Sequence, residues 1–197
     1  MESSQKHHNF KVCKPFGMLS QFSTNCKHQK KKHFLGDLGQ FPENIMPIGR
    51  LDEDSEGLLL LTTCGKTSYY VNSSKVEKEY YAQIDGLITS EALNQLQNGL
   101  NISINGDLYK TKPCKAFKIL ELPELPERRK KIRDERHGPT SWVSITVTEG
   151  KFRQVRKMTA AVGFPTLRLV RVRIGAIKLD PNLFNTPKEI KQIKNFI

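Results

Sequence analysis

The sequence predicts an α+β fold, and three observations support this class. Residues 142–149 alternate apolar and polar side chains, which is the pattern of a half-buried strand. Residues 89–98 carry apolar side chains at helical spacing. Residues 58–61 are four consecutive leucines, and a short apolar run bounded by glycines favours a buried strand over a helix.

The remaining strands follow from composition and from the residues that end them. Pro15 ends the first strand and Gly86 ends the second, since proline cannot continue a ladder and glycine favours turns. Pro123 and Pro126 follow the third. These strands and the last one are expected at residues 10–14, 78–85, 114–122 and 166–174.

Two helices are indicated by their ends and faces. Thr89 or Ser90 can cap the helix of residues 89–98, and Gly99 stands where a helix stops. The second covers residues 151–162. Its expected apolar face consists of Phe152, Val155, Thr159 and Val162 with Met158 beside it, and its basic face of Arg153, Arg156 and Lys157.

The length of 197 residues fits one domain with a lobed core. Residues 1–9 are polar and are expected to be a flexible leader. They carry no apolar core of a signal peptide. Residues 10–180 are expected to form the domain itself, as two lobes around one cleft. Residues 181–197 have mixed character and are expected to be a peripheral segment, with a pattern compatible with a helix.

The charge balance indicates the kind of partner. Lys plus Arg number 32 against 20 Asp plus Glu, a net charge of +12, which suggests nucleic acid or an acidic membrane surface. No apolar stretch is long enough to span a membrane. The four cysteines form no Cys-x-x-Cys pair, so neither zinc nor redox chemistry is supported, and we expect reduced thiols in a cytoplasmic protein.

The stretch from Gly49 to Gly65 organises the chain. Four carboxylates, Asp52, Glu53, Asp54 and Glu56, occupy five positions just before the leucine run, and Arg50 precedes them. In an extended entry Arg50 and Asp52 point to the same side. Composition alone favours a solvated acidic loop, whereas a loop at the mouth of a buried strand is also a usual place for functional side chains.

This stretch resembles the signature of the RNA pseudouridine synthases of the RsuA type. Gly49-Arg50-Leu51-Asp52 followed by Ser55-Glu56-Gly57 and the leucine run is similar to their catalytic motif. The resemblance implies that Asp52 is the catalytic aspartate, acting as nucleophile or base. It also implies a helix after the leucine strand, at residues 67–74, although their helix propensity is poor.

Three further motifs extend the resemblance over residues 10–180. Lys14-Pro15-x-Gly17 is similar to the first family motif, and Lys78-Glu79-Tyr80 to the Lys-x-Tyr motif, whose tyrosine stacks on the target base. Residues 149–158 resemble the motif Glu-Gly-x-x-x-Gln-Val-Arg-x-Met, which implies that Arg156 pairs with Asp52. The Ser-Gln-Phe ending at residues 20–22 and the Pro-Thr-Ser-Trp run at residues 139–142 are typical of the RluE-like branch.

The resemblance implies a fold and a reaction. The fold is a large mixed, mostly antiparallel bent sheet with flanking helices and a central basic cleft. The reaction isomerises a specific uridine of ribosomal RNA, of the 23S large-subunit type, to pseudouridine by base flipping, with no cofactor and no metal. We expect the N-terminal RNA-binding domain of many relatives to be absent, because little sequence precedes the Lys-Pro motif. Thr-Cys-Gly at residues 63–65 replaces the usual Thr-Asn-Asp-Gly.

Basic side chains are expected to hold the RNA phosphates. The loop of residues 27–33 contains two histidines, but its cations oppose a dication, so a phosphate-binding loop is favoured over a metal site. The polar arm of residues 126–139 either stays an exposed loop or orders on RNA, and we expect the second. The expected RNA-binding residues are Arg50, Arg153, Lys157, Arg128, Arg129, Lys130, Lys131, Arg133, Lys30 and Lys31.

Two other functions remain open at this point. A non-catalytic ribosomal RNA-binding protein of the same fold would explain the charge equally well. A hydrolase using the carboxylates of residues 52–56 with magnesium would lose activity with a chelator. The sequence does not distinguish nucleophilic attack by Asp52 from proton abstraction, and it does not identify the uridine. We expect a monomer.

Overall fold

The fold is taken from a computed structural model, which describes residues 7–73, 76–128, 130–180, 183, 186–191 and 193. Its strands are β1 Asn9–Lys14, β2 Met46–Ile48, β3 Glu56–Thr62, β4 Lys78–Asp85, β5 Asn101–Ile104, β6 Asp107–Lys110, β7 Lys115–Ile119, β8 Thr140–Val147, β9 Thr166–Ile174, β10 Ile177–Lys178 and β11 Lys188–Glu189. Its α-helices are α1 Gly65–Asn72, α2 Ser90–Asn98 and α3 Gln154–Ala161, and its 3₁₀ turns are η1 Lys27–Gln29, η2 Leu35–Leu38 and η3 Glu135–His137.

Nine of these strands form one mixed sheet in the order β11-β1-β3-β9-β4-β8-β7, with β2 beside β3 and β10 beside β9. Every strand pair of this sheet is antiparallel except β3 with β9. The expected α+β class with a large, mostly antiparallel mixed sheet is therefore confirmed. The strands β5 and β6 form a separate hairpin.

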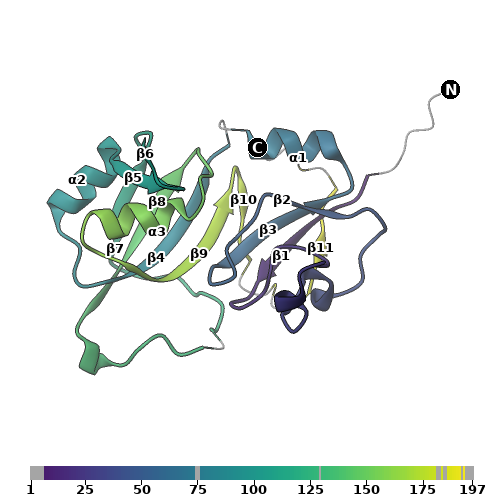
Figure 1. Cartoon of the computed structure of the whole chain (residues 1–197), viewed down its shortest axis with the longest axis horizontal. Coiled ribbons are helices and arrows are strands. Elements are labelled where there is room, and N and C mark those ends of the chain that lie inside the picture. The colour runs from purple at the N-terminus through teal and green to yellow at the C-terminus, as the bar shows by residue number, and fades with distance from the viewer. Residues whose placement is uncertain are drawn as a thin grey trace.

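The sheet divides into two halves that meet where β3 lies beside β9 (Figure 1). One half contains β4, β7, β8 and β9 and is covered by α2 and α3 over a core that includes Leu96, Ile145 and Met158. The other half contains β1, β2 and β3. There the leucine run alternates between two cores, with Leu58 and Leu60 in one and Leu59 and Leu61 in the other. A strand covered on both faces requires such a continuous apolar run.

The halves join where β3 runs parallel to β9, through only two registered pairs, Glu56 with Val170 and Gly57 with Arg171. Gly57 has a φ of +104°, and a Cβ there would lie 2.3 Å from the carbonyl oxygen of Arg171. Only glycine allows the two backbones to approach this closely. Arg171 is buried and its Nε donates to the carbonyl of Leu58 over 2.8 Å, which ties the same junction.

Most predicted elements are confirmed, with small changes of their ends. The expected strands correspond to β1, β3, β4, β7, β8 and β9, and the expected helices to α1, α2 and α3. Thr89 caps α2 by accepting the amide of Ala92. The strands β2, β5, β6, β10 and β11 were not predicted, because they are short and lack a clear alternation.

Three predictions about these elements were wrong in detail. The helix expected at residues 151–162 begins only at Gln154, because Arg153 takes a left-handed conformation with φ 51°. Phe152 is consequently 60% exposed and lies outside the apolar face. The strand β8 is buried on both faces, because Ser144 and Thr146 on its polar face are buried as fully as Val143 and Ile145 on the other.

The chain ends differ from expectation where they are described. The strand β11 extends the sheet at β1, and Ile193 packs in the core beside Leu58, so this tail contributes an edge strand where a peripheral helix was expected. Residues 1–6 of the expected leader lie outside the described residues, and Asn9 already belongs to β1. No helix in the described part of the chain is long and apolar enough to cross a membrane.

Candidate active site

The loop of residues 51–55 leads into β3 and is fastened from the half that contains β1. Leu51 is buried, and the hydroxyl of Ser20 both donates to its carbonyl over 2.7 Å and accepts its amide over 3.0 Å. The amide of Gly17 donates to the carbonyl of Glu53 over 2.8 Å. Asp52 therefore sits on a backbone that cannot shift freely, as a catalytic side chain requires.

Lys14 is buried and anchors this loop through hydrogen bonds. Its ammonium donates to the carbonyls of Met18 (2.7 Å), Pro15 (3.0 Å) and Glu53 (3.4 Å). Burial lowers the pKa of Lys14 to about 8, against the raising effect of the nearby carboxylates of residues 52–56. The Lys-Pro motif therefore holds the loop below Asp52, on the side away from the pocket described next.

Asp52 lies in a pocket of about 130 Å³ that is lined from both halves. Its side chain is 25% exposed. Burial raises the pKa of Asp52 above its ordinary value, helped by Asp54 and opposed by Arg153, Arg156 and Lys14. Tyr80, Lys78 and Arg171 line the same pocket from β4 and β9, and Arg50 lines it beside Asp52. The structure thus places Asp52, Tyr80 and Arg50 around one pocket, as the sequence suggested, and adds Arg153, for which only a phosphate contact was expected.

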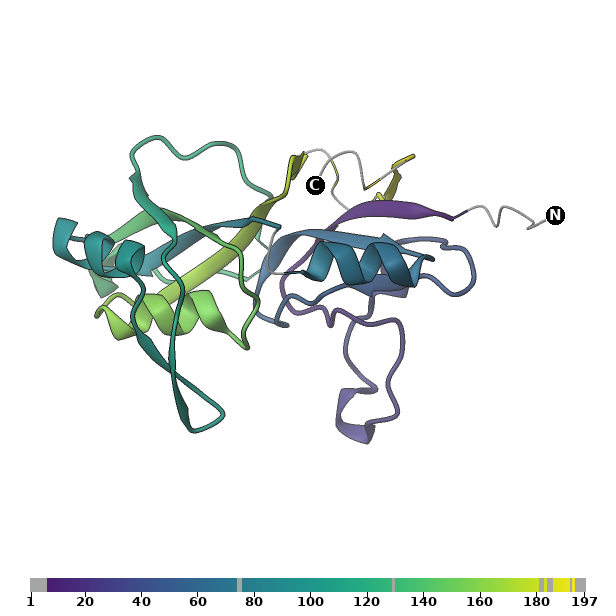
Figure 2. The same ribbon diagram turned by 90° about the horizontal axis from the view of Figure 1, so that it is seen from above.

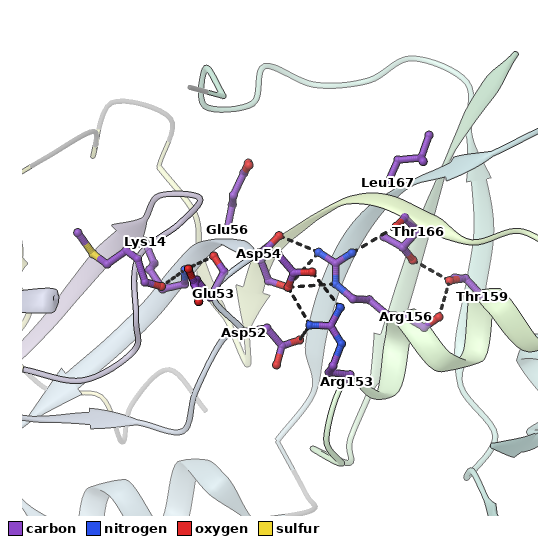
Figure 3. A network of polar contacts seen from close by, with 12 residues as sticks. Lys14, Asp52, Glu53, Asp54, Glu56, Arg153, Arg156, Thr159, Thr166 and Leu167 are labelled. Carbon is purple, nitrogen blue, oxygen red and sulfur yellow. Dashed lines mark hydrogen bonds and ion pairs between the residues drawn. The ribbon is translucent and has the colours of Figure 1, made fainter. Parts of the chain in front are cut away.

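The ion pair predicted between Arg156 and Asp52 is wrong in this structure. Arg153 is the arginine that reaches Asp52, with 3.6 Å between its Nη1 and the Asp52 Oδ2. Arg156 donates instead to the carbonyl of Asp54 over 2.7 Å and to the hydroxyl of Ser55 over 3.3 Å (Figure 3). The reason is the start of α3: with Arg153 in the left-handed region before the helix, its side chain points at the loop of residues 52–54.

Asp54 belongs to this site, although its sequence position gave it only a loop role. Both Arg153 nitrogens bond its carboxylate, Nη1 to Oδ1 over 3.0 Å and Nη2 to Oδ2 over 2.8 Å. Burial acts to raise the pKa of Asp54, but the bonds from Arg153 and the charge of Arg156 leave it below its ordinary value. The sequence carried no signal that distinguished Asp54 from Glu53, because residues 53 and 54 form a turn and the alternation of an extended strand does not apply there.

The turn before α3 is held by two polar residues of its motif, Glu149 and Gln154, both buried. Gln154 donates to Glu149 over 2.8 Å and accepts the amide of Lys151 over 3.0 Å. Glu149 also accepts the hydroxyl of Tyr109 and the amide of Lys112 from the hairpin side. These bonds fix the turn, and the turn places Arg153 over Asp52.

Several residues expected to bind phosphates already have partners within the chain. Arg128 is only 10% exposed and pairs with buried Glu56 over 3.1 Å, with its guanidinium 4.3 Å from the ring centre of Phe16. Arg133 pairs with Asp85 through both nitrogens. Where a phosphate contact was expected for Arg128 and Arg133, the structure therefore shows an ion pair within the chain, because buried guanidinium groups need a carboxylate.

The arm of residues 126–139 is accordingly fastened to the sheet, in Figure 1 as the long green loop below β4 and β7. Besides Arg128, the carbonyl of Pro126 accepts Arg168, which also pairs with Glu56 over 2.7 Å. Our expectation that the arm orders only on RNA does not hold at this anchor. Arg129 lies outside the described residues.

Other basic residues keep their charges at the surface. Lys130 and Lys131 are exposed on the arm, and Lys30 and Lys31 are exposed on the loop after η1. Lys157 is half-buried; its ammonium donates to the carbonyl of Ser103 over 2.7 Å. Figure 2 shows the loop around η1 and the β5–β6 hairpin projecting from the same side of the sheet, on which α3 also lies.

The carboxylates of residues 52–56 face cations of the chain. Glu53 pairs with Lys32 over 2.5 Å, and Glu56 points away from Arg153 and Arg156 in Figure 3. Within the described ranges, no three His, Cys, Asp or Glu side chains are arranged to hold a metal ion. What the site offers chemically is a partly desolvated carboxylate with an arginine beside it and a tyrosine in the same pocket.

The chain is similar in sequence to known proteins. The chain is 41% identical over 169 residues to the ribosomal large subunit pseudouridine synthase E of Xanthomonas axonopodis pv. citri (strain 306), covering 85% of each chain. It is 36% identical over 182 residues to the uncharacterized RNA pseudouridine synthase YtzG of Bacillus subtilis (strain 168), covering 91% of this chain and 67% of the other.

Solved structures give the same result for the fold. A crystal structure of a pseudouridylate synthase matches with a TM-score of 0.73 at 25% identity, covering 93% of this chain and 70% of the other. A Cbf5-Nop10-Gar1 complex matches with a TM-score of 0.55 at 17% identity, covering 90% of this chain and 51% of that one, and shares the fold alone. Residues 8–161 match the family described as RNA pseudouridylate synthase, and the chain therefore belongs to the RNA pseudouridine synthases.

Proposed function

We propose that this enzyme converts a uridine of large-subunit ribosomal RNA to pseudouridine, with Asp52 as the catalytic residue. The observation that carries the proposal is the position of Asp52, partly exposed on the floor of a pocket lined by Tyr80 and Arg153. The relatives named ribosomal large subunit pseudouridine synthase E support this choice of RNA. Acting on ribosomal RNA, the enzyme works in the cytoplasm, and we expect it to do so as a monomer.

The reaction breaks the bond between the ribose carbon 1′ and the uracil nitrogen 1, and joins the same carbon 1′ to carbon 5. Carbon 5 loses its hydrogen as a proton and nitrogen 1 takes up a proton, so the product has the composition of the substrate and no oxidant is needed. An ionised carboxylate can act on the sugar either as nucleophile or as proton acceptor. Arg153 stabilises the charged form of Asp52, whose burial works against ionisation.

The target base must leave its stack to reach Asp52, at a cost of a few kcal/mol. Tyr80 offers a ring face within the pocket on which the uracil stacks, which recovers part of this cost. Arg171 lies 6.0 Å from the ring centre of Tyr80 and holds that ring against the sheet junction. Lys78 lines the pocket two residues before Tyr80, and burial together with the charge of Arg171 lowers the pKa of Lys78 to about 8.

The RNA lies against the side of the sheet from which the loop around η1 and the β5–β6 hairpin project (Figure 2). Lys30 and Lys31 on that loop and Arg50 at the pocket bind its phosphates, since all three are exposed. Lys130 and Lys131 on the arm are further candidates. Replacing one phosphate-binding cation with a neutral residue should lower the salt dependence of binding by about one unit of slope.

Release of tritium from ribosomal RNA labelled at carbon 5 of uridine tests the proposal. The RNA is taken from cells lacking the modification, and wild type is compared with Asp52→Asn with a chelator present. We expect release by the wild type and none by Asp52→Asn, whose binding to RNA stays intact. Small-subunit RNA serves as the control substrate and is expected to release nothing.

Each other outcome points elsewhere. Equal release by wild type and Asp52→Asn would remove Asp52 from the mechanism. Binding without release from any ribosomal RNA would favour the non-catalytic RNA-binding protein. Release that stops with the chelator would favour a metal-dependent reaction.

A further inference from the structure

Asp54 takes up most of the hydrogen-bonding capacity that Arg153 directs at the loop. The guanidinium of Arg153 forms two short bonds with the Asp54 carboxylate, of 3.0 and 2.8 Å, but reaches Asp52 only through one contact of 3.6 Å. Arg156 adds a contact of 3.6 Å from its Nε to Asp54 Oδ1. Figure 3 shows Asp54 between both arginines and Asp52 to one side.

This division matters because a catalytic carboxylate has two conflicting needs. It needs a positive neighbour to stay ionised in a partly buried pocket. It also needs its oxygens free for the substrate, whereas an arginine that pairs with both oxygens occupies them. With the fork of Arg153 bonded to Asp54, Asp52 keeps a counter-charge and leaves both oxygens without a short bond to arginine.

We propose that Asp54 is a positioning residue that holds Arg153 beside Asp52 and prevents it from pairing fully with Asp52. The proposal rests on the assignment of Asp52 as the catalytic carboxylate. Asp54 acts through Arg153 and touches neither the base nor the sugar.

The backbone supports this assignment independently. Arg153 has a φ of 51°, a left-handed conformation that residues other than glycine adopt only rarely. Such strain persists only where the surroundings hold it, and it gathers at functional sites. Here the two bonds to Asp54 hold the side chain, and the bonds of Glu149 and Gln154 hold the turn.

Replacing Asp54 with asparagine keeps the shape and removes the charge. Arg153 then turns its fork to Asp52, and the repulsion between the two carboxylates disappears. Both changes lower the pKa of Asp52, so the acid limb of the pH–rate profile moves to lower pH. The other charged groups that line the pocket are Arg50, Lys78, Glu149, Lys151 and Arg171, and Lys14 and Arg156 lie behind the loop; the substitution changes none of them.

The experiment measures tritium release by wild type and Asp54→Asn as a function of pH and of RNA concentration. We expect kcat near neutral pH to fall by about tenfold to a hundredfold, because the substrate finds Asp52 occupied. KM for the RNA stays unchanged, and the acid limb moves to lower pH. Glu43→Gln, a change in an exposed carboxylate in the turn before β2, is the control and alters neither quantity.

A cycle with Arg153→Gln tests whether Asp54 acts through the arginine. Coupled residues give non-additive effects, so Asp54→Asn should reduce kcat little further once Arg153 is replaced. Losses that multiply in the double variant would overturn the proposal, as would an acid limb that stays in place in Asp54→Asn.

A titration without substrate separates this proposal from the proposed reaction. The carboxyl carbon of Asp52, followed by NMR in protein labelled at aspartate and assigned with Asp52→Asn, should titrate at lower pH in Asp54→Asn than in wild type. An unchanged or raised Asp52 pKa would contradict the proposal even if tritium release is normal. A lowered pKa in an enzyme that releases no tritium would leave Arg153 positioned as described and refute the reaction instead.

Discussion

Replacing Gly57 with alanine tests whether the close approach of β3 and β9 joins the two halves of the fold. Gly57 occupies one of the two residue pairs through which these strands are registered. An added Cβ would lie 2.3 Å from the carbonyl oxygen of Arg171, 2.8 Å from its amide nitrogen and 3.0 Å from Val170 Cγ1. Two of these three atoms are backbone, so no side-chain rotation relieves the clash.

The magnitude follows from two separate costs. A positive φ costs an alanine roughly 1–2 kcal/mol whatever its surroundings. The clash adds about 1–3 kcal/mol, as overpacking does in rigid interiors, because the strands must separate by roughly one ångström. The junction then loses its registered pairing and the bond from Arg171 to the Leu58 carbonyl. We expect a total loss of about 2–5 kcal/mol in the free energy of unfolding.

Gly163→Ala is the control, because Gly163 has a similar φ of +89° but nothing within 4 Å of an added Cβ. Urea unfolding followed by far-ultraviolet circular dichroism gives the stability of both variants. Fluorescence of Trp142, the single tryptophan, reports on β8 in the half with α2 and α3. Equal losses in the two variants would refute the argument, since the backbone contact would then contribute nothing.

Three further predictions concern charged groups. Asp52→Asn should raise the melting temperature at neutral pH, because burial raises the pKa of Asp52 and its ionisation therefore destabilises the fold there. This gain should disappear below the unfolded pKa of 3.8, and a lower melting temperature at neutral pH would contradict the prediction. Glu56→Gln should lower the free energy of unfolding in urea by about 3–5 kcal/mol, because buried Arg128 loses its carboxylate partner. A loss no larger than that of Glu53→Gln would show that Glu56 does not stabilise the fold through Arg128. Burial lowers the pKa values of Lys14 and Lys78 to about 8, against 10.5 in the unfolded chain, so the unfolded chain binds more protons between these values. The free energy of unfolding should therefore rise with pH from about 8 upward, and it should rise less in Lys78→Met. A slope that Lys78→Met leaves unchanged would argue against a buried lysine charge.

The fold could be predicted where a local pattern has one physical solution. A run of four leucines that follows a glycine must be covered on both faces. In the structure β3 has one apolar core on each face. Thr89 and Gly99 delimit α2 because each satisfies the helix end chemically. Short strands such as β11 form only because a longer neighbour offers an edge, so their own residues carry no signal.

The sequence predicted Asp52, Tyr80 and Arg50 at the candidate site, but it predicted neither the part of Asp54 nor the pairing of the arginines. The spacing of Arg153 and Arg156 places both near the start of α3, and either could reach the loop of residues 52–54. Which one faces Asp52 depends on whether the helix includes residue 153. Its left-handed backbone is imposed by the bonds of Glu149 and Gln154, and these are contacts that a periodicity argument does not include.

The acidic stretch before β3 connects separate parts of the molecule through its individual side chains. Glu53 pairs with the basic loop through Lys32, and Asp54 bonds Arg153 at the start of α3. Glu56 lies on the opposite side and pairs with Arg168 of β9 and Arg128 of the arm. Because the parallel junction itself has only two registered pairs, the ion pairs of Asp54 and Glu56 add to what fixes one half against the other. Asp52 differs from these three carboxylates because Arg153 reaches it only over 3.6 Å, which leaves its oxygens available for the role that we propose for it.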